Sequence, residues 1–155
     1  MSLPELFSGR LRLRACGVLV EKGQLLAVNL RSPVTDQMIW IPPGGEVEFG
    51  ESLKEAVKRE FAEETKVRVQ VHGLLHVEEL IRKEFHAVEC YFEVSRIAGE
   101  PELGSDPELE DHKQLLQKVD WLPISDLSHF KVVPQRLVSK LKDWENRSLL
   151  QLGGH

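Results

Sequence analysis

Residues 45–67 read GEVEFGESLKEAVKREFAEETKV, in which a glycine-containing turn leads into a run with helical spacing. Ser52 and Glu55 stand three residues apart at the start of that run. This spacing predicts a capping box, in which each side chain accepts a hydrogen bond from the other residue's backbone N–H. Apolar side chains then recur at intervals of three and four residues, which favours one buried helix face. We therefore expect a helix from Leu53 to about Thr65.

Three carboxylates of this helix lie on or beside the face that its apolar residues mark as buried. At about 100° per residue, Glu60 and Glu64 fall within roughly 20° of Leu53, and Glu63 borders the same face. Burying an ionised carboxylate without a partner is unfavourable, and neighbouring carboxylates repel each other. A divalent cation removes both penalties, because Mg²⁺ prefers oxygen ligands. The pattern therefore indicates a metal site, and the alternative interpretation is a solvated acidic helix face.

Pro43-Gly44-Gly45 directly precedes this segment. Glycine allows the backbone to bend sharply and to approach a ligand closely. Backbone amides and carbonyls there can face a metal ion or a phosphate oxygen. We expect a loop at these residues, after a short strand over residues 38–41 that ends because proline lacks the N–H that a central strand donates.

The spacing from Gly45 to Glu51, and then across seven residues to the run Arg59-Glu60-Phe61-Ala62-Glu63-Glu64, closely resembles the Nudix box of the MutT-like hydrolases. Gly45 to Val67 spans the whole motif, and one defining position differs, because Lys66 stands where the family has glycine. The family glycine ends the helix, often in a left-handed conformation. A lysine there costs on the order of 1 kcal/mol. All acidic positions are intact, so we interpret Lys66 as a change in stability and not in activity.

The resemblance implies a mixed α/β fold, the Nudix-type α/β/α sandwich, in which a mixed β-sheet lies between helices. We expect residues 1–155 to form this single domain. The resemblance further implies that Mg²⁺, or Mn²⁺ in its place, is bound by Glu60, Glu63, Glu64 and the carbonyl of Gly44. Family members often add an acidic ligand from a later loop, and Glu110 is our choice ahead of its neighbours Glu108 and Asp111.

The same resemblance assigns catalytic roles. Glu60 is the first choice for the base that deprotonates the attacking water, and Glu63 and Glu64 complete the acidic set. Arg59 would orient Glu60, and Glu51 and Arg59 would together brace the loop and the helix.

The function implied is that of a Mg²⁺-dependent pyrophosphohydrolase, which cleaves the phosphoanhydride bond of a nucleoside diphosphate linked to another moiety. The substrate would be a nucleoside-diphosphate sugar or a dinucleotide. One alternative is a sanitising pyrophosphatase that removes modified nucleoside triphosphates. A second is a nucleotide-sensing module without catalysis, which the intact carboxylates disfavour. The resemblance also bears on ADP-ribose, because family members of that type usually have a proline some way after the box. No proline occurs between Pro43 and Pro101, which weakens the case for an ADP-ribose substrate.

Other residues offer contacts to a nucleotide, each with a plainer alternative. Arg31, Arg82 and Lys83 are candidates for phosphate contacts, although each is also typical of a surface cation. Trp40 and Phe85 are candidates for stacking on a base, although core packing is the simpler interpretation.

The overall composition narrows the class of partner. The formal net charge is -5, which argues against an extended nucleic-acid track or an anionic membrane surface, since both require a basic face. No segment approaches the roughly 18 apolar residues of a membrane span. Residues 1–5 lack a signal-peptide pattern, so we expect a cytoplasmic protein. Cys16 and Cys90 lie in apolar runs and are interpreted as small buried side chains.

The remaining secondary structure is predicted from apolar patterning and turn residues. We expect strands over residues 13–20, 25–30, 67–71, 74–81, 85–94 and 118–122, of which the first two form a hairpin, and a loop over residues 99–111. Pro134 opens a C-terminal helix in which Leu137, Leu141 and Trp144 recur at helical spacing. Because homodimers are common in the family, the final 149–152 run either packs on a second copy or frays in solvent.

Overall fold

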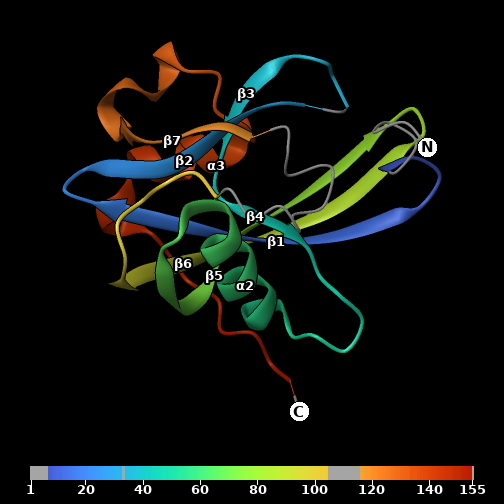
Figure 1. Ribbon diagram of the computed structural model, residues 1–155, viewed down its shortest axis with the longest axis horizontal. Helices are drawn as coiled ribbons and strands as arrows, with labels where there is room; N and C mark the ends of the chain where they lie inside the picture. Colours follow the sequence, from blue (N-terminus) through green and yellow to red (C-terminus); the bar gives the residue numbers. More distant parts are fainter. Residues whose placement is uncertain (1–6, 33, 105–115, 155) are drawn as a thin grey trace.

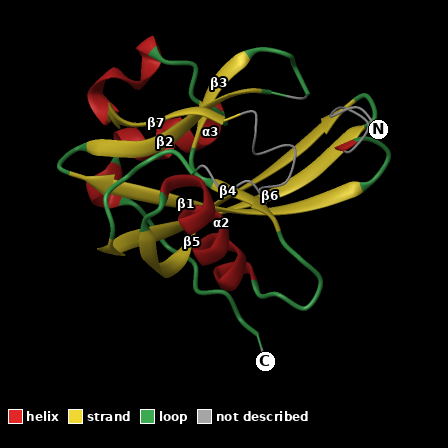
Figure 2. Ribbon diagram, in the orientation of Figure 1, coloured by secondary structure: helices red, strands yellow, loops and turns green. Residues whose placement is uncertain are grey.

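The computed structural model describes residues 7–32, 34–104 and 116–154 of the chain. Seven strands form one mixed sheet with the order β3-β2-β1-β6-β5, to which β4 is added beside β1 and β7 beside β2. The strands are β1 (Leu11–Glu21), β2 (Gln24–Arg31), β3 (Met38–Ile41), β4 (Gly44–Glu46), β5 (Arg68–Arg82), β6 (Phe85–Ala98) and β7 (Leu116–Pro123). The helices are α2 (Leu53–Thr65) and α3 (Gln135–Lys142), with 3-10 turns at Ile124–His129 and Trp144–Asn146. The expected mixed α/β fold is therefore confirmed (Figure 2).

Strand β1 joins the two halves of the sheet. It runs parallel to β6 along nine residue pairs and antiparallel to β4, whereas β2 pairs with β3 and β7. The predicted hairpin between β1 and β2 exists only at its turn, where Val20 faces Leu25 and Glu21 faces Gln24. Beyond that turn the two strands take different partners and diverge (Figure 1). The hairpin prediction is thus correct for the turn and wrong for the rest of both strands.

Two apolar clusters hold the helices against the strands. The first cluster lies under α2 and combines its Val57 and Phe61 with residues of β1, β5 and β6. The second combines Leu137 and Leu141 of α3 with Tyr91 of β6 and with residues of β1 and β2. Burial of apolar surface on both faces of the sheet stabilises the layered arrangement.

Several predicted boundaries need correction. The two strands expected over residues 67–71 and 74–81 are one strand, β5, which continues past register shifts near Leu74, and β6 extends to Ala98. The loop expected at Pro43-Gly44-Gly45 is in part the short strand β4, because Gly44 and Gly45 pair with β1. Pro134 precedes α3 as its N-cap, and Trp144 lies in a separate 3-10 turn after the helix ends.

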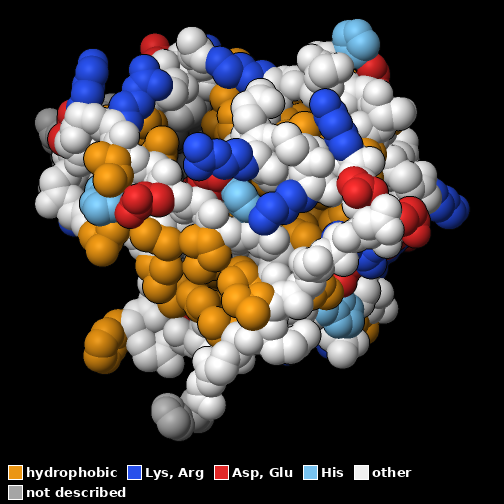
Figure 3. All heavy atoms as spheres, turned by 180° about the vertical axis from the view of Figure 1, so that it is seen from behind, with side chains coloured by type: hydrophobic (Ala, Val, Ile, Leu, Met, Phe, Trp, Pro, Cys, Tyr) orange, Lys and Arg blue, Asp and Glu red, His pale blue; other side chains and the backbone are white. Residues whose placement is uncertain are grey.

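The structure contradicts fraying at Leu150, whereas the packing of residues 149–152 on a second copy stays a prediction. The backbone of Leu150 exchanges hydrogen bonds with Leu74 at 2.7 and 2.8 Å, so this run extends the edge of β5 in its own chain. Exposed apolar side chains, Leu11 and Ile81 among them, remain on the sheet, and Figure 3 shows apolar groups gathered on the rear surface. Within the described ranges, no helix is long and apolar enough to cross a membrane.

Candidate active site

Helix α2 begins and ends where the sequence predicts. Ser52 accepts from the Glu55 amide at 3.1 Å, and Glu55 accepts from the Ser52 amide at 3.3 Å, which completes the capping box. At the other end, Lys66 takes the left-handed conformation with φ 62°, and its amide donates to the carbonyl of Ala62 at 2.9 Å. The local sequence therefore fixes both ends of the helix that carries the acidic residues.

Glu60 and Glu64 are both buried, at 2% exposure each, and both reach β4. The Gly44 amide donates to Oε2 of Glu64 at 3.3 Å. A Cβ at Gly45 would lie 2.5 Å from Oε2 of Glu60, which is closer than any normal contact. Gly45 therefore leaves space for the Glu60 carboxylate, and Gly44 binds the Glu64 carboxylate through its backbone N–H, so both carboxylates of α2 lie against the β4 backbone.

Arg59 connects the helix to the turn that precedes it. Its guanidinium donates to both carboxylate oxygens of Glu51, at 2.7 and 2.9 Å, and to the carbonyl of Glu46 at 3.1 Å. Nη1 of Arg59 also lies 2.8 Å from Glu60 and 3.6 Å from Glu63. The hydrogen bonds to Glu51, together with the charge of Glu60, raise the pKa of Arg59 despite the opposing effect of partial burial. The expected bracing contacts of Arg59 and Glu51 are thus present.

The residues at this point suit a hard divalent cation. Glu60, Glu63 and Glu64 supply only oxygen atoms, which is the donor set that Mg²⁺ prefers, and the absence of a side chain at Gly45 leaves room for the Glu60 carboxylate beside β4. Among the described residues, no three acidic, histidine or cysteine side chains are already arranged as a metal site. Glu110, with its neighbours Glu108 and Asp111, lies outside the described residues. The ligand set therefore stays a prediction.

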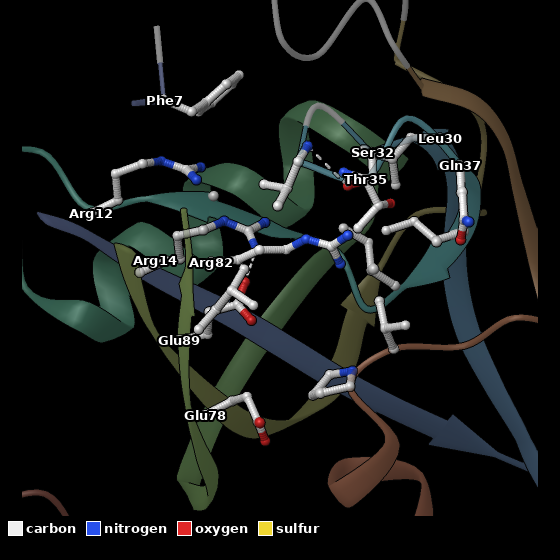
Figure 4. Close-up of a pocket in the computed structure, with 18 of the residues that line it drawn as sticks. Phe7, Arg12, Arg14, Leu30, Ser32, Thr35, Gln37, Glu78, Arg82 and Glu89 are labelled. Atoms are coloured by element: carbon white, nitrogen blue, oxygen red, sulfur yellow. Dashed lines mark hydrogen bonds and ion pairs between the residues drawn. The ribbon is translucent and has the colours of Figure 1, made fainter. Parts of the chain in front are cut away.

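A cavity of about 420 Å³ opens beside β4, between the diverging halves of the sheet (Figure 4). Gly45 and Glu46 form part of its wall, so the space near Glu60 and the cavity share the short strand β4. Apolar side chains from β2, β3, β5 and β6 form much of the remainder, including Ile39, Ile41 and Leu80. A cavity of this size, largely apolar with a few polar groups, is typical of a small-molecule site.

Charged side chains cross the cavity floor in register. Glu46 of β4 faces Arg14 of β1, Arg14 faces Glu89 of β6, and Glu89 faces Glu78 of β5. Arg14 forms an ion pair with Glu89, and Glu46 accepts from Arg12 at 3.2 Å. Burial lowers the pKa of Arg12 to about 10, which leaves it cationic at neutral pH.

The cations proposed from sequence differ in their positions. Arg82 lines the cavity, whereas Arg31 pairs with exposed Asp36 and Lys83 occupies an exposed turn. The sequence analysis missed Arg12 and Arg14, which lie two residues apart on β1. Strand β1 pairs with β6, about 75 residues further along the chain, and no local sequence pattern reveals that pairing.

The aromatic candidates for base stacking belong to the core, as the plainer interpretation held. Trp40 packs edge-on against Phe130 with ring centroids 6.1 Å apart, and Phe85 is 6% exposed. Neither ring lines the cavity. Cys16 and Cys90 are also buried, and burial raises the pKa of both thiols.

Comparison with known proteins gives matches along most of the chain. A family model of the NUDIX domain matches residues 10–142. An m7GpppN-mRNA hydrolase of Xenopus laevis is 43% identical over 72 residues, which make up 44% of this chain and 24% of the frog protein. The match thus spans about a quarter of the length of that curated relative.

Solved structures resemble the fold along nearly its whole length. A MutT NUDIX hydrolase from Burkholderia pseudomallei has a TM-score of 0.70 and 24% identity, over 86% of this chain and 97% of the other. An ADP-ribose pyrophosphatase from Streptococcus suis has a TM-score of 0.64 and 14% identity, over 91% of this chain and 96% of the other. At these identities the likeness shows a shared fold.

Proposed function

The chain belongs to the NUDIX domain family, and on this premise we propose that it is a metal-dependent pyrophosphohydrolase of nucleoside-diphosphate compounds. The observation that carries the proposal is the position of Glu60 and Glu64. Both are buried carboxylates, and both lie against the glycine strand that also forms the cavity wall. A phosphoanhydride bound in the cavity would therefore meet the acidic end of the site.

We assign the metal ligands to Glu60, Glu63, Glu64 and the Gly44 carbonyl. Gly44 donates its N–H to Glu64 and not to β1, and a residue in an antiparallel strand directs its N–H and C=O to the same side. The Gly44 carbonyl therefore points towards the helix that bears the carboxylates. Bound there, a divalent ion would supply charge neutralisation for the phosphates and a lowered pKa for a coordinated water.

Side chains of the protein would then accept the proton of the attacking water and position the reacting groups. Glu60 accepts the proton of the attacking water through its carboxylate, while Arg59 holds that carboxylate from the side at 2.8 Å. The Arg59 pair with Glu51 anchors the turn before the helix, and the hydrogen bond from Arg59 to the Glu46 carbonyl joins the helix to β4. The apolar wall of the cavity limits access of bulk water to the reacting phosphorus.

The cavity supports a substrate with a nucleoside-sized group beyond the diphosphate. Its volume of about 420 Å³ lies within the usual range for small-molecule sites. Nucleoside-diphosphate sugars and dinucleotides fit this description, as do the modified triphosphates of the sanitising alternative. The frog relative is named as an RNA-cap hydrolase, which is also a dinucleotide-type chemistry, although the match covers a small part of that protein.

Phosphate release in a coupled phosphatase assay tests the proposal. The panel contains nucleoside-diphosphate sugars, dinucleotides and modified triphosphates, each with Mg²⁺, with Mn²⁺ and with EDTA. We expect metal-dependent turnover of at least one class. Glu60→Gln should lower kcat by at least about 100-fold, and the exposed Glu145→Gln serves as the matched control. A folded protein that turns over nothing in the panel, or a Glu60→Gln variant with half its activity, would refute the assignment.

A further inference from the structure

We propose that Arg82, assisted by Thr35, selects substrates that carry one further anionic group beyond the diphosphate that is cleaved. The inference rests on the proposed function and adds a substrate class to it. Arg82 stands at the end of β5 and lines the cavity, and Figure 4 shows its side chain extending across the cavity towards Thr35 and Ser32.

The ion pairs of the cavity set Arg82 apart from the other two arginines. Arg14 is paired with Glu89, and Arg12 with Glu46, so the charges of both are compensated within the protein. Among the described residues, no carboxylate forms an ion pair with Arg82. A guanidinium over a largely apolar cavity gains most from an anion that the ligand itself supplies, because charge-assisted hydrogen bonds are the strong ones.

Lys131 is the other cavity-lining cation without an ion pair to a described residue. Its backbone carbonyl accepts from Trp40 at 2.8 Å, so the residue is tied to the opposite half of the sheet from Arg82. Lysine provides a point charge, whereas the planar guanidinium of Arg82 can bind a phosphate or a carboxylate through two parallel hydrogen bonds. For this reason the selection is assigned to Arg82.

Thr35 supplies the second observation. Its Oγ1 atom is buried, yet it has no hydrogen-bond partner in the described protein. Nearby, Ser32 Oγ already accepts from the amides of Val34 and Thr35 at 3.2 Å each, which fixes the turn that presents Thr35 to the cavity. A buried hydroxyl without a partner is unfavourable unless a ligand or water satisfies it. Oγ1 and the Arg82 guanidinium thus offer donors from opposite walls of the cavity.

Two kinds of substrate carry such an extra anionic group. One is a nucleotide with a third phosphate, and the other is a nucleoside-diphosphate sugar with a carboxylate. The neutral nucleoside-diphosphate hexoses lack it. The same guanidinium would bind either group, so the substrate pairs in the test must separate them.

Binding is measured by calorimetry in EDTA with α,β-methylene analogues, which cannot be cleaved. The first pair is a nucleoside-diphosphate hexose and the corresponding hexuronic acid, which differ by one carboxylate. The second pair is a nucleoside diphosphate and its triphosphate. Both pairs are run in uridine and adenosine forms. We expect the anionic member of at least one pair to bind about tenfold more tightly, as one charge-assisted hydrogen-bonding group allows.

Three variants assign that preference. Arg82→Gln should abolish it and leave binding of the neutral member within about twofold, whereas Arg82→Lys should keep part of it. Thr35→Val should weaken binding of the anionic member by about two- to tenfold. Lys83→Gln, which removes the neighbouring exposed cation, is the matched control and should keep the preference.

The outcomes separate this inference from the proposed function. A preference for the hexuronic acid identifies a carboxylate as the anionic group, and a preference for the triphosphate identifies a phosphate. Equal binding within both pairs, no binding of any analogue, or an unchanged preference in Arg82→Gln overturns the role of Arg82. The proposed hydrolysis is tested separately in the metal-dependent assay, because it does not depend on the extra anion.

Discussion

Replacing each of the two adjacent glycines of β4 with alanine should separate stability from activity. A Cβ at Gly44 would lie 2.6 Å from the carbonyl oxygen of Ala15 and 2.6 Å from Cα of Cys16, both in the backbone of β1. Backbone cannot move without opening the strand pair. A Cβ at Gly45 would instead meet the Glu60 carboxylate, at 2.4 to 2.7 Å.

The expected losses of stability and of rate follow from the atoms that each added methyl group must displace. Overpacking a well-packed site typically costs about 1–3 kcal/mol, so Gly44→Ala should lower Tm by roughly 2–12 °C in a domain of this size. In Gly45→Ala the carboxylate must retreat by about 1 Å to restore an ordinary contact, since the Cβ would stand 2.4 Å from the Glu60 carboxylate carbon. A displacement of that size in a reacting group can cost about 100-fold in rate.

Thermal unfolding and steady-state kinetics on the two variants check this expectation, with Gly153→Ala as control because a Cβ there meets nothing within 4 Å. We expect Gly45→Ala to keep most of its stability and to lose kcat by about two orders of magnitude. Combining it with Glu60→Gln should add little further loss, because both changes remove the same group. A Gly45→Ala variant with near-normal kcat, or one destabilised as strongly as Gly44→Ala, would show that Glu60 is not the group displaced.

Three further predictions use other parts of the molecule. Lys66→Gly should raise the free energy of unfolding by about 0.5–1 kcal/mol in urea titrations with kcat unchanged, because glycine relieves the left-handed strain. Burial alone would raise the pKa of Glu46. The hydrogen bond from Arg10 and the charge of Arg12 outweigh the effect of burial, so the pKa of Glu46 is lowered. Its stabilising effect is present above the unfolded-state pKa of about 4.3 and is lost as pH falls through the folded value, so the unfolding free energies of wild type and Glu46→Gln should converge below about pH 4. Burial raises the pKa of the Cys16 and Cys90 thiols, so a disulfide reagent at pH 8 should label neither in the native protein and both after denaturation; rapid native labelling of Cys16 would contradict its burial.

The helix and its acidic residues could be predicted from sequence because their determinants are local. Ser52, Glu55 and the apolar spacing define α2 within a few turns, and the motif places Arg59 beside Glu60. The left-handed backbone of Lys66 could also be predicted, because a helix often ends in that conformation at this position.

The cavity could not be predicted in the same way because its parts meet through long-range strand pairing. Arg14 faces Glu89 only because β1 runs parallel to β6, and Thr35 meets the cavity only because β1 and β2 diverge after their turn. The sequence predicts a loop where β4 lies, because glycine is disfavoured in strands. Its pairing with β1 depends on close approach that only the folded chain reveals.

The divergence of β1 and β2 also has an evolutionary consequence. The residues assigned to hydrolysis lie within residues 44–64, whereas most of the cavity wall, apart from Gly45 and Glu46, is assembled from β1, β2, β3, β5 and β6 and the segments beside them. Substitutions that alter which compound is accepted can therefore accumulate in one set of positions while the other set is left untouched. Such a division lets a lineage, or a protein engineer, retune selectivity without rebuilding the reaction centre.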